Sequence, residues 1–405
     1  MRKKIAFVTP SLLPMPPVKG GAMETLVNHL LLCNEEGHEY DFTVYCVGGE
    51  VAQAAAKEYR HTRFCHLPGK AFCPRFDDLL VRGCRKLLHL ELSPERAYGK
   101  RAAKALSEEA FDLVIVENQP EFLPLVRKAA PHTPVWLHLH NHPSNFSQKG
   151  LRGLSGCDGV LAVSDFIREE TLGACSLRPE QVLAFKNCVD TGRFDAGRHS
   201  EERRKIRARF GVGEEDVVLM YSGRLSEGKG VGELMEAFLQ EPDPTLKLLL
   251  VGSDWYGANG KTPFISYLQS LAEKAPDRVF QTGFVPFAEM PAYYAAADIC
   301  VLPSLLEEAA PLTVLEALAA GKPLIGTDAG GIVENVSEDC AVIVKRDENF
   351  VPSLAAAIGM LKDDPELRCR MGEAGRKRME TRDVESYYER FRQILIEICG
   401  RSHAD

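Results

Sequence analysis

The segment that follows the apolar run 299–302 carries the densest group of residues that could do chemistry. Glu308 and Glu316 stand eight positions apart, and Pro311 between them suits the first turn of a helix. The free amide groups at that helix start, those of Leu312 and Thr313, would form a site for an anion. Because a carboxylate can accept hydrogen bonds from vicinal hydroxyl groups, the segment predicts a site for a hydroxyl-rich sugar beside an anion. The alternative is a charged helix start and a surface Glu, but Glu316 lies in an apolar run, where a buried carboxylate needs a partner.

A second group of charged residues follows the apolar run 217–221. Arg224 and Lys229 stand in a glycine-rich loop at the predicted carboxyl end of a strand. Arg can bind phosphate oxygens bidentately and Lys acts as a compact charge, so the pair could clamp a pyrophosphate. Such a clamp would stabilise the negative charge that develops as a nucleoside diphosphate leaves. The alternative is a pair of surface charges on a solvated loop.

Gly20-Gly21 comes after the first predicted strand and before a predicted helix. Glycines in that position let backbone N–H groups approach an anion at the positive end of the helix. The segment matches neither G-x-G-x-x-G nor the Walker A motif, so a plain strand-to-helix loop explains it equally well.

His138, His140 and His142 alternate along the chain. If one strand ran through all three, their imidazoles would share a face and could bind zinc. Pro143 marks a loop, and no cysteine nearby supplies a further ligand, so we expect no metal site. A single histidine at the strand end, acting as a hydrogen-bond donor to a ligand, is favoured, and a structural role for His138 stays open.

Short apolar runs alternate with helical patterns along the whole chain, which predicts an α/β fold. Such alternation requires parallel sheets with right-handed crossovers, covered by helices on both faces. We therefore expect two Rossmann-like, doubly wound parallel-sheet domains. The predicted strands are 4–8, 42–47, 113–117, 135–140, 160–163 and 182–185, followed by 217–221, 247–251, 279–281, 299–302, 324–326 and 341–344.

The break between the two series of strands falls within 190–213, which reads as a linker leading into a charged helix. We therefore expect a first domain over 1–195 and a second over 196–383. Ligands of doubly wound sheets bind at the carboxyl ends of the strands, so a cleft where the two domains face each other is the predicted site.

Composition excludes several classes of protein. The 405 residues are 45% hydrophobic and 26% charged, as in soluble globular chains. The net charge of −8 lacks the basic excess of nucleic-acid binders, so no nucleic-acid partner is expected. The apolar run after the basic start is too short for a signal peptide, and no run approaches a membrane span. We expect a cytoplasmic protein with reduced cysteines.

The stretch 75–104 contains eight basic residues and four acidic ones, interleaved with leucines. It could dock on anionic lipid at the inner membrane face or hold a phosphorylated acceptor. A solvated helical face explains the same pattern equally well.

Taken in chain order, these residues resemble the large family of retaining, nucleotide-sugar-dependent glycosyltransferases with twin Rossmann domains, the GT-B fold of family 4, group 1 type. The motifs that carry the resemblance cover nearly the whole chain. They are Gly20-Gly21, Val163-Ser164, Asn187 to Asp190 with Phe194, Gly223-Arg224 with Lys229-Gly230, Val251-Gly252, Thr282 to Val285, Pro303-Ser304, Glu308 to Glu316 and Gly330 to Glu334.

The resemblance implies roles for single residues. Arg224 and Lys229 would clamp the donor pyrophosphate, Glu308 would hold sugar hydroxyls and Glu316 the ribose. Other implied contacts are Val285 with the base through its backbone, Gly21 with the donor phosphate and acceptor, and His140, or less closely matching His138, near the anomeric centre. The resemblance also implies a C-terminal helix over 384–400 that crosses back to the first domain, and a front-face mechanism without a bound metal or other cofactor. No D-x-D sequence occurs in the chain, in agreement with that mechanism.

The expected function is transfer of a hexose from a nucleotide sugar to a saccharide or lipid-linked acceptor for cell-surface polysaccharide or glycoconjugate synthesis. A UDP-sugar is preferred on family frequency only, because Ala309 and Ala310 replace the frequent Gly and aromatic residue after the first Glu, beside the sugar. Cys188 replaces a usual Gly, which bears on turn geometry. Two alternatives remain, a UDP-sugar epimerase of the same fold and a non-catalytic spore-coat or surface protein. Oligomeric state and linkage have no signal in the sequence.

Overall fold

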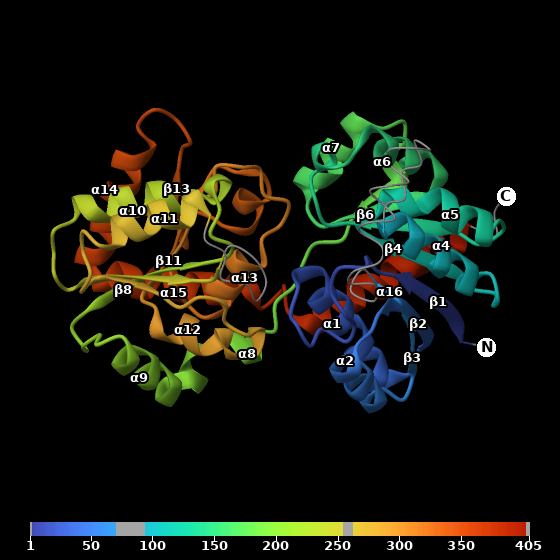
Figure 1. Ribbon diagram of the computed structural model, residues 1–405, viewed down its shortest axis with the longest axis horizontal. Helices are drawn as coiled ribbons and strands as arrows, with labels where there is room; N and C mark the ends of the chain where they lie inside the picture. Colours follow the sequence, from blue (N-terminus) through green and yellow to red (C-terminus); the bar gives the residue numbers. More distant parts are fainter. Residues whose placement is uncertain (1, 70–93, 254–261, 402–405) are drawn as a thin grey trace. The chain divides into compact units, whose positions relative to one another are not determined.

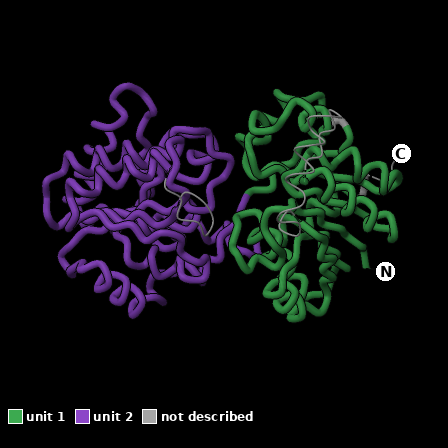
Figure 2. Tube along the Cα trace, viewed as in Figure 1, with its two compact units in different colours: residues 1–186, 387–405 green, residues 187–386 purple. Residues whose placement is uncertain are grey.

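The computed structural model describes residues 2–69, 94–253 and 262–401. The chain forms two compact units, shown in different colours in Figure 2. Unit 1 comprises Met1–Lys186 and Tyr387–Asp405, and unit 2 comprises Asn187–Ser386. Each unit has its own parallel sheet and its own core.

Unit 1 is built on a seven-stranded parallel sheet with the strand order β3-β2-β1-β4-β5-β6-β7. The order reverses between β1 and β4, so the loops that follow these two neighbouring strands adjoin at the carboxyl edge of the sheet. The strands are β1 (Lys3–Val8), β2 (Tyr40–Val47), β3 (Thr62–Leu67), β4 (Leu113–Glu117), β5 (Val135–Leu139), β6 (Gly159–Ala162) and β7 (Val182–Ala184).

Helices cover both faces of this sheet (Figure 1). The last helix, α16 (Val384–Arg401), returns to unit 1, where Phe391 packs on Phe7 and Tyr387 stacks on Phe185. The other α-helices of unit 1 that lie within the described residues are α1 (Ala22–Gly37), α2 (Glu50–Ala55), α4 (Pro94–Leu106), α5 (Leu123–Ala129), α6 (Gln148–Gly153) and α7 (Asp165–Ala174).

Unit 2 repeats the plan with six parallel strands in the order β10-β9-β8-β11-β12-β13. Here the order reverses between β8 and β11. The strands are β8 (Val217–Ser222), β9 (Leu246–Val251), β10 (Val279–Gln281), β11 (Ile299–Leu302), β12 (Leu324–Thr327) and β13 (Ala341–Val344). The α-helices are α8 (Thr191–Phe194), α9 (Ser200–Arg209), α10 (Val231–Gln240), α11 (Pro263–Ala272), α12 (Met290–Ala296), α13 (Leu312–Ala319), α14 (Phe350–Asp363) and α15 (Pro365–Met379).

The predicted fold class is confirmed, because both sheets are parallel and each predicted strand overlaps an observed one. The sequence pattern predicts no strand at the position of β3. This strand lies at the edge of the sheet, and Arg63 and His66 interrupt its apolar residues. An edge strand does not need the continuous apolar run of a central one.

The contacts divide the chain between Lys186 and Asn187, whereas the sequence predicts a division after residue 195. The reason is packing, since Val189 and Phe194 are buried in the core of unit 2. A linker rich in turn residues was expected there, but its apolar side chains anchor it to the second sheet.

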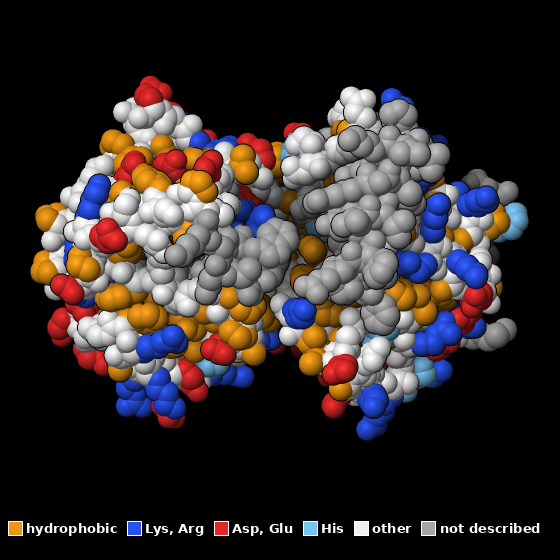
Figure 3. Space-filling view, viewed as in Figure 1, with side chains coloured by type: hydrophobic (Ala, Val, Ile, Leu, Met, Phe, Trp, Pro, Cys, Tyr) orange, Lys and Arg blue, Asp and Glu red, His pale blue; other side chains and the backbone are white. Residues whose placement is uncertain are grey.

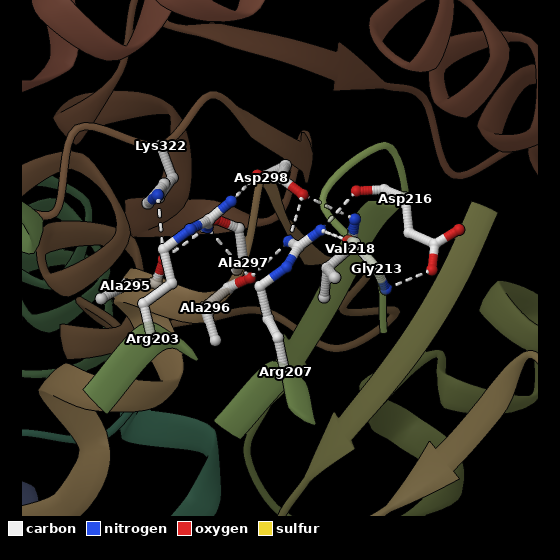
Figure 4. A network of polar contacts seen from close by, with 10 residues as sticks. All are labelled: Arg203, Arg207, Gly213, Asp216, Val218, Ala295, Ala296, Ala297, Asp298 and Lys322. Atoms are coloured by element: carbon white, nitrogen blue, oxygen red, sulfur yellow. Dashed lines mark hydrogen bonds and ion pairs between the residues drawn. The ribbon is translucent and has the colours of Figure 1, made fainter. Parts of the chain in front are cut away.

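A network of polar contacts ties α9 to the sheet of unit 2 (Figure 4). Asp298, just before β11, accepts hydrogen bonds from Arg203 at 3.2 Å and Arg207 at 3.0 Å. The same carboxylate accepts the Val218 amide of β8 at 2.8 Å. Arg207 is only 4% exposed, and it also donates to the carbonyl groups of Gly213, Asp216 and Ala296. A buried guanidinium of this kind is stable only while its partners remain.

Part of the predicted basic stretch 75–104 lies outside the described residues. Within α4, the basic side chains all belong to exposed residues, while Tyr98 and Ala102 are buried. These basic residues are Arg96, Lys100, Arg101 and Lys104. Over unit 2, acidic and basic side chains are interspersed on the face seen in Figure 3. Among the helices described, none combines the length and the apolar character that crossing a bilayer demands. Contact with a membrane surface stays a prediction.

Candidate active site

Lys229 and Glu308 meet where the strand order of unit 2 reverses. Lys229 lies in the loop after β8, Glu308 lies in the loop after β11, and these strands are neighbours. Lys229 Nζ donates to Glu308 Oε1 at 2.6 Å, and Ser304 Oγ donates to the same oxygen at 2.5 Å. The side chains of Lys229 and Glu308 are 23% and 11% exposed, so the pair is held in place yet open to a ligand at its edge.

Close backbone contacts fix these two loops against each other. A Cβ atom on Gly230, which has a φ of 69°, would lie 1.8 Å from the Pro303 carbonyl oxygen. The Gly228 carbonyl accepts hydrogen bonds from the amides of Leu305 and Leu306. Glycine at 230 therefore permits the approach that brings Lys229 to Glu308.

The start of α13 lies just after Glu308 and presents free amide groups, as the sequence predicts. Pro311 is the N-cap residue, and no side chain caps the helix. Leu312 and Thr313 form the first turn and are half-buried. Uncapped N–H groups at a helix start favour an anion, because both the groups and the helix dipole are positive there.

Glu316 is buried inside α13 and has the partner that a buried carboxylate requires. Tyr294 Oη, from α12, donates to Glu316 Oε2 at 2.8 Å. Burial raises the pKa of Glu316 to about 7, although the Tyr294 hydrogen bond and the nearby charge of Arg193 act in the opposite direction. In its ionised form Glu316 can accept a hydrogen bond from a ligand hydroxyl in addition to the one from Tyr294.

Because the folded pKa of Glu316 is raised, its stabilising contribution is present below the ordinary value of 4.5 and is lost as the pH rises through about 7. We expect Glu316→Gln to remove this loss. Between pH 5 and pH 8 the unliganded wild type should lose on the order of 2 kcal/mol of unfolding free energy relative to the variant. Urea unfolding at both pH values measures this difference. The exposed Glu289→Gln serves as control, and parallel curves for wild type and Glu316→Gln would contradict the expectation.

The other predicted donor contacts lie on loops at the same carboxyl edge of unit 2. Arg224 is exposed, and its guanidinium forms no ion pair with any described residue. Val285 is half-buried, two residues after Gly283, whose carbonyl accepts the Gly252 amide at 3.1 Å. The loops after β8, β9 and β10 are in backbone contact, since a Cβ atom on Gly252 would lie 2.0 Å from the Gly223 carbonyl oxygen.

In unit 1, Gly21 begins α1 with a φ of 110° and no side-chain cap. Glu24 covers this glycine, since a Cβ atom on Gly21 would lie 2.1 Å from Glu24 Oε2. Glu24 is 4% exposed, and burial raises its pKa to about 7, with the nearby Glu117 acting in the same direction. Gly21 therefore does more than open a loop, because it makes room for a buried carboxyl group.

Glu117, at the end of β4, joins His138 and His140 of the next strand end. Glu117 Oε2 lies 3.0 Å from His138 Nδ1 and 2.9 Å from His140 Nε2. Burial opposes ionisation of Glu117, but the charge of His138 and the hydrogen bonds from both rings outweigh it and hold its pKa at about 2. Burial and the charge of His138 lower the pKa of His140 to about 4, so His140 is neutral at pH 7.

Each of these three residues offers a ligand atom within 4.8 Å of the others, a spacing that could accept a metal ion. His142 is not part of the group. Strand β5 ends at Leu139, and His142 instead binds Ser144 and lies 3.1 Å from Glu170. The arrangement of three histidines on one strand face, considered from the sequence, is therefore not formed.

Sequence reasoning gave no site role to Glu24, Tyr294 or Ser304. Glu24 had a signal, because it stands between apolar residues of a helix, as Glu316 does. Tyr294 had none, since a tyrosine in an apolar helix is common. Ser304 belongs to a motif of the family resemblance, but that motif assigns it no contact with Glu308. Their role follows only from which side chains they contact.

The fold is similar to that of solved structures. Anabaena Alr3699/HepE in complex with UDP-glucose superposes with a TM-score of 0.76 at 21% identity, over 97% of this chain and 99% of that one. Two doubly wound parallel-sheet domains with this likeness define the GT-B class of fold.

Sequence comparison gives the family. Residues 36–193 match the model of Glycosyltransferase Family 4, and residues 202–378 match Glycosyl transferases group 1. Spore coat protein SA of Bacillus subtilis is 26% identical over 388 residues, which is 93% of this chain and 95% of that protein. The GDP-mannose-dependent alpha-(1-6)-phosphatidylinositol monomannoside mannosyltransferase of Mycolicibacterium smegmatis is 32% identical over 270 residues, 62% of this chain and 67% of that enzyme. The chain belongs to the group 1 glycosyltransferases and is a transferase enzyme.

Proposed function

We propose that this enzyme transfers a hexose, with retention of anomeric configuration, from a UDP-sugar to a saccharide or lipid-linked acceptor in cell-surface polysaccharide or glycoconjugate synthesis. The observation that carries the proposal is the contact of Lys229 with Glu308 beside the uncapped start of α13. It places a cation, a carboxylate and free amides together, which suits a phosphate joined to a sugar.

In the proposed mechanism the residues of unit 2 hold the donor. Lys229 and Arg224 would bind the pyrophosphate and stabilise the charge on the departing nucleoside diphosphate. Glu308 would then accept hydrogen bonds from sugar hydroxyls, and Glu316 from the ribose. A leaving phosphate oxygen would take the proton of the attacking acceptor hydroxyl on the same face of the sugar. These steps need no metal ion.

The names of related proteins point to different bases in the donor nucleotide. Anabaena HepE was solved with UDP-glucose, whereas the mycobacterial relative is named for GDP-mannose. We favour UDP and treat GDP as the alternative outcome.

Thermal unfolding with UDP, UDP-glucose, GDP, GDP-mannose and ADP, each with magnesium or with a chelator, tests the donor class. A ligand at about 100 times its Kd stabilises the folded state by about 2.7 kcal/mol. We expect a clear rise in Tm with uridine nucleotides alone, unchanged by the chelator. A shift only with guanosine nucleotides would replace UDP by GDP, and loss of the shift in chelator would contradict the metal-free mechanism.

Two further outcomes separate the alternative functions. An epimerase would convert the nucleotide sugar into a new nucleotide sugar without any acceptor, whereas a transferase would give at most slow hydrolysis. A non-catalytic coat protein would show no shift with any nucleotide although it is folded. Glu308→Ala should abolish donor turnover, and unchanged turnover would show that the assigned site is wrong.

A further inference from the structure

The ends of β4 and β5 hold the backbone of His140 in a fixed place. The Asn118 amide donates to the His138 carbonyl at 2.8 Å, and the His140 amide donates to Asn118 Oδ1 at 3.0 Å. Asn118 has a φ of 50°, a left-handed conformation that turns its side chain back to the neighbouring strand end. The main chain of His140 is thus anchored before its ring makes any contact.

The ring of His140 is anchored by Glu117. His140 Nε2 lies 2.9 Å from Glu117 Oε2, and His138 Nδ1 approaches the same oxygen at 3.0 Å. The side chain of Glu117 is 0% exposed, that of His138 2% and that of His140 9%. The two ring nitrogens also lie 3.2 Å from each other, so at most one of them could donate to the other. Because an ionised carboxylate oxygen only accepts hydrogen bonds, the arrangement that satisfies both contacts with Glu117 has a proton on each of these nitrogens.

A neutral imidazole carries one proton, and this proton fixes the character of its other nitrogen. With Nε2 of His140 protonated toward Glu117, its Nδ1 has a free lone pair and can only accept. We propose that Glu117 is a positioning residue that holds His140 in the Nε2–H form, so that Nδ1 accepts a hydrogen bond from a hydroxyl group of the sugar substrate.

This inference rests on the proposed function and makes it more specific. From the sequence we expect a histidine that donates a hydrogen bond to a ligand, whereas the proposed tautomer makes Nδ1 of His140 an acceptor. A fully ionised phosphate oxygen has no proton to offer, so Nδ1 selects a hydroxyl group instead. His140 therefore discriminates sugar from phosphate by the position of one proton.

A metal ion is the competing occupant, since it would use the same three donor atoms. Histidines that bind metal normally donate their second N–H to a neighbour. His138 Nε2 is buried without a hydrogen-bond partner in the part of the chain that the structure describes. We therefore favour hydrogen bonds from the two histidines to Glu117 over a bound metal ion. The experiments below include a measurement that would detect such an ion.

The first experiment reads the tautomer directly and needs no substrate. In protein with 15N-labelled histidine, long-range proton–nitrogen NMR spectra distinguish a protonated ring nitrogen from a bare one, and His140→Gln assigns the signals. We expect a protonated Nε2 and a bare Nδ1 at His140 in the wild type at pH 7. The opposite tautomer in the wild type would overturn the inference, whether or not any variant folds.

Variants then show whether Glu117 is the cause. Glu117→Met removes the acceptor at similar length and should leave His140 as a mixture of tautomers. Glu117→Gln keeps an amide oxygen for the rings and should retain the wild-type form. Glu109→Met is the control, because Glu109 forms its ion pairs with Lys4, near the amino end of β1, and with Arg63 of β3. A wild-type tautomer in Glu117→Met would overturn the role of Glu117.

A double-mutant cycle on the active enzyme separates positioning from general stability. We expect Glu117→Met to lower kcat/KM about ten-fold, as loss of one hydrogen bond would, and to have no further effect in a His140→Ala background. Equal effects in both backgrounds would show a merely structural role. If the nucleotide sugars tested are not substrates, the proposed function fails while the tautomer result stands.

Metal analysis of the purified wild type completes the test. We expect less than a tenth of an equivalent of zinc, nickel, manganese or iron, and no change in the NMR signals of His140 with chelator. One tightly bound equivalent that Glu117→Met releases would overturn the inference and make Glu117 a metal ligand.

Discussion

Replacing Lys229 by Ala should lower kcat/KM for the donor by about 100- to 1000-fold. Lys229 is the cation at the reversal point of the second sheet, where its ammonium group bonds to Glu308. In the proposed mechanism its removal would take away charge stabilisation for the leaving diphosphate. Glu308 would also lose its cationic partner, although Ser304 still donates to it, so donor binding should weaken as well. Initial rates over a range of donor concentrations, with UDP binding measured by calorimetry, give both effects.

Lys247→Ala is the matched control, because Lys247 contacts the Asp277 carbonyl from β9, away from the carboxyl edge. It should keep the wild-type kcat/KM. Lys229→Arg retains the charge but not the compact geometry, so its kcat/KM should lie between those of Lys229→Ala and the wild type. A kcat/KM within about three-fold of the wild type for Lys229→Ala would remove Lys229 from the proposed clamp.

Asp298→Ala should lower the unfolding free energy of unit 2 by about 3 to 5 kcal/mol. The substitution leaves the guanidinium of Arg207, which is 4% exposed, without its counter-charge and frees the Val218 amide. Asp298→Asn keeps an acceptor for Val218 but loses the charge, so we expect a smaller loss. Urea unfolding followed by circular dichroism measures the unfolding free energy of the wild type and of both variants.

The pH dependence of this effect has a definite sign. Burial disfavours the charged form of Asp298, but the Val218 amide and both arginines outweigh it and lower the pKa from 3.8. Its stabilising contribution is therefore present above pH 4 and lost as the pH falls toward the folded pKa. The difference in unfolding free energy between the wild type and Asp298→Ala should therefore decrease as the pH falls. Glu201→Ala, which breaks an exposed pair with Lys205, should change nothing measurable, and an equal loss there would contradict the role of burial.

The alternation of apolar runs and helical patterns was enough to predict both sheets. Central strands such as β11, and β4 up to Val116, are buried on both faces, so these segments are continuously apolar and can be recognised locally. Strand β3 could not be predicted in this way, because it is an edge strand whose apolar residues are interrupted by Arg63 and His66. The limits of the linker could not be predicted either, because Val189 and Phe194 pack on a core formed by residues far along the chain.

Residue types and spacing also named the chemical groups of the site in unit 2. Glu316 stood out because a carboxylate in an apolar helix requires a partner, and the free amides followed from Pro311. Only the tertiary structure decided that Tyr294 is that partner. The contact of Lys229 with Glu308 likewise depends on β8 and β11 being neighbours, which spacing along the chain does not encode.

The same division holds for the histidines. Sequence alone determined that His138 and His140 stand at the end of a strand, because an apolar run precedes them and Pro143 follows. It could not determine which nitrogen of His140 faces a carboxylate, since Glu117 lies on another strand. Local periodicity comes from backbone geometry and is written in adjacent residues, whereas the position of a proton depends on a neighbour that only folding brings within hydrogen-bond distance.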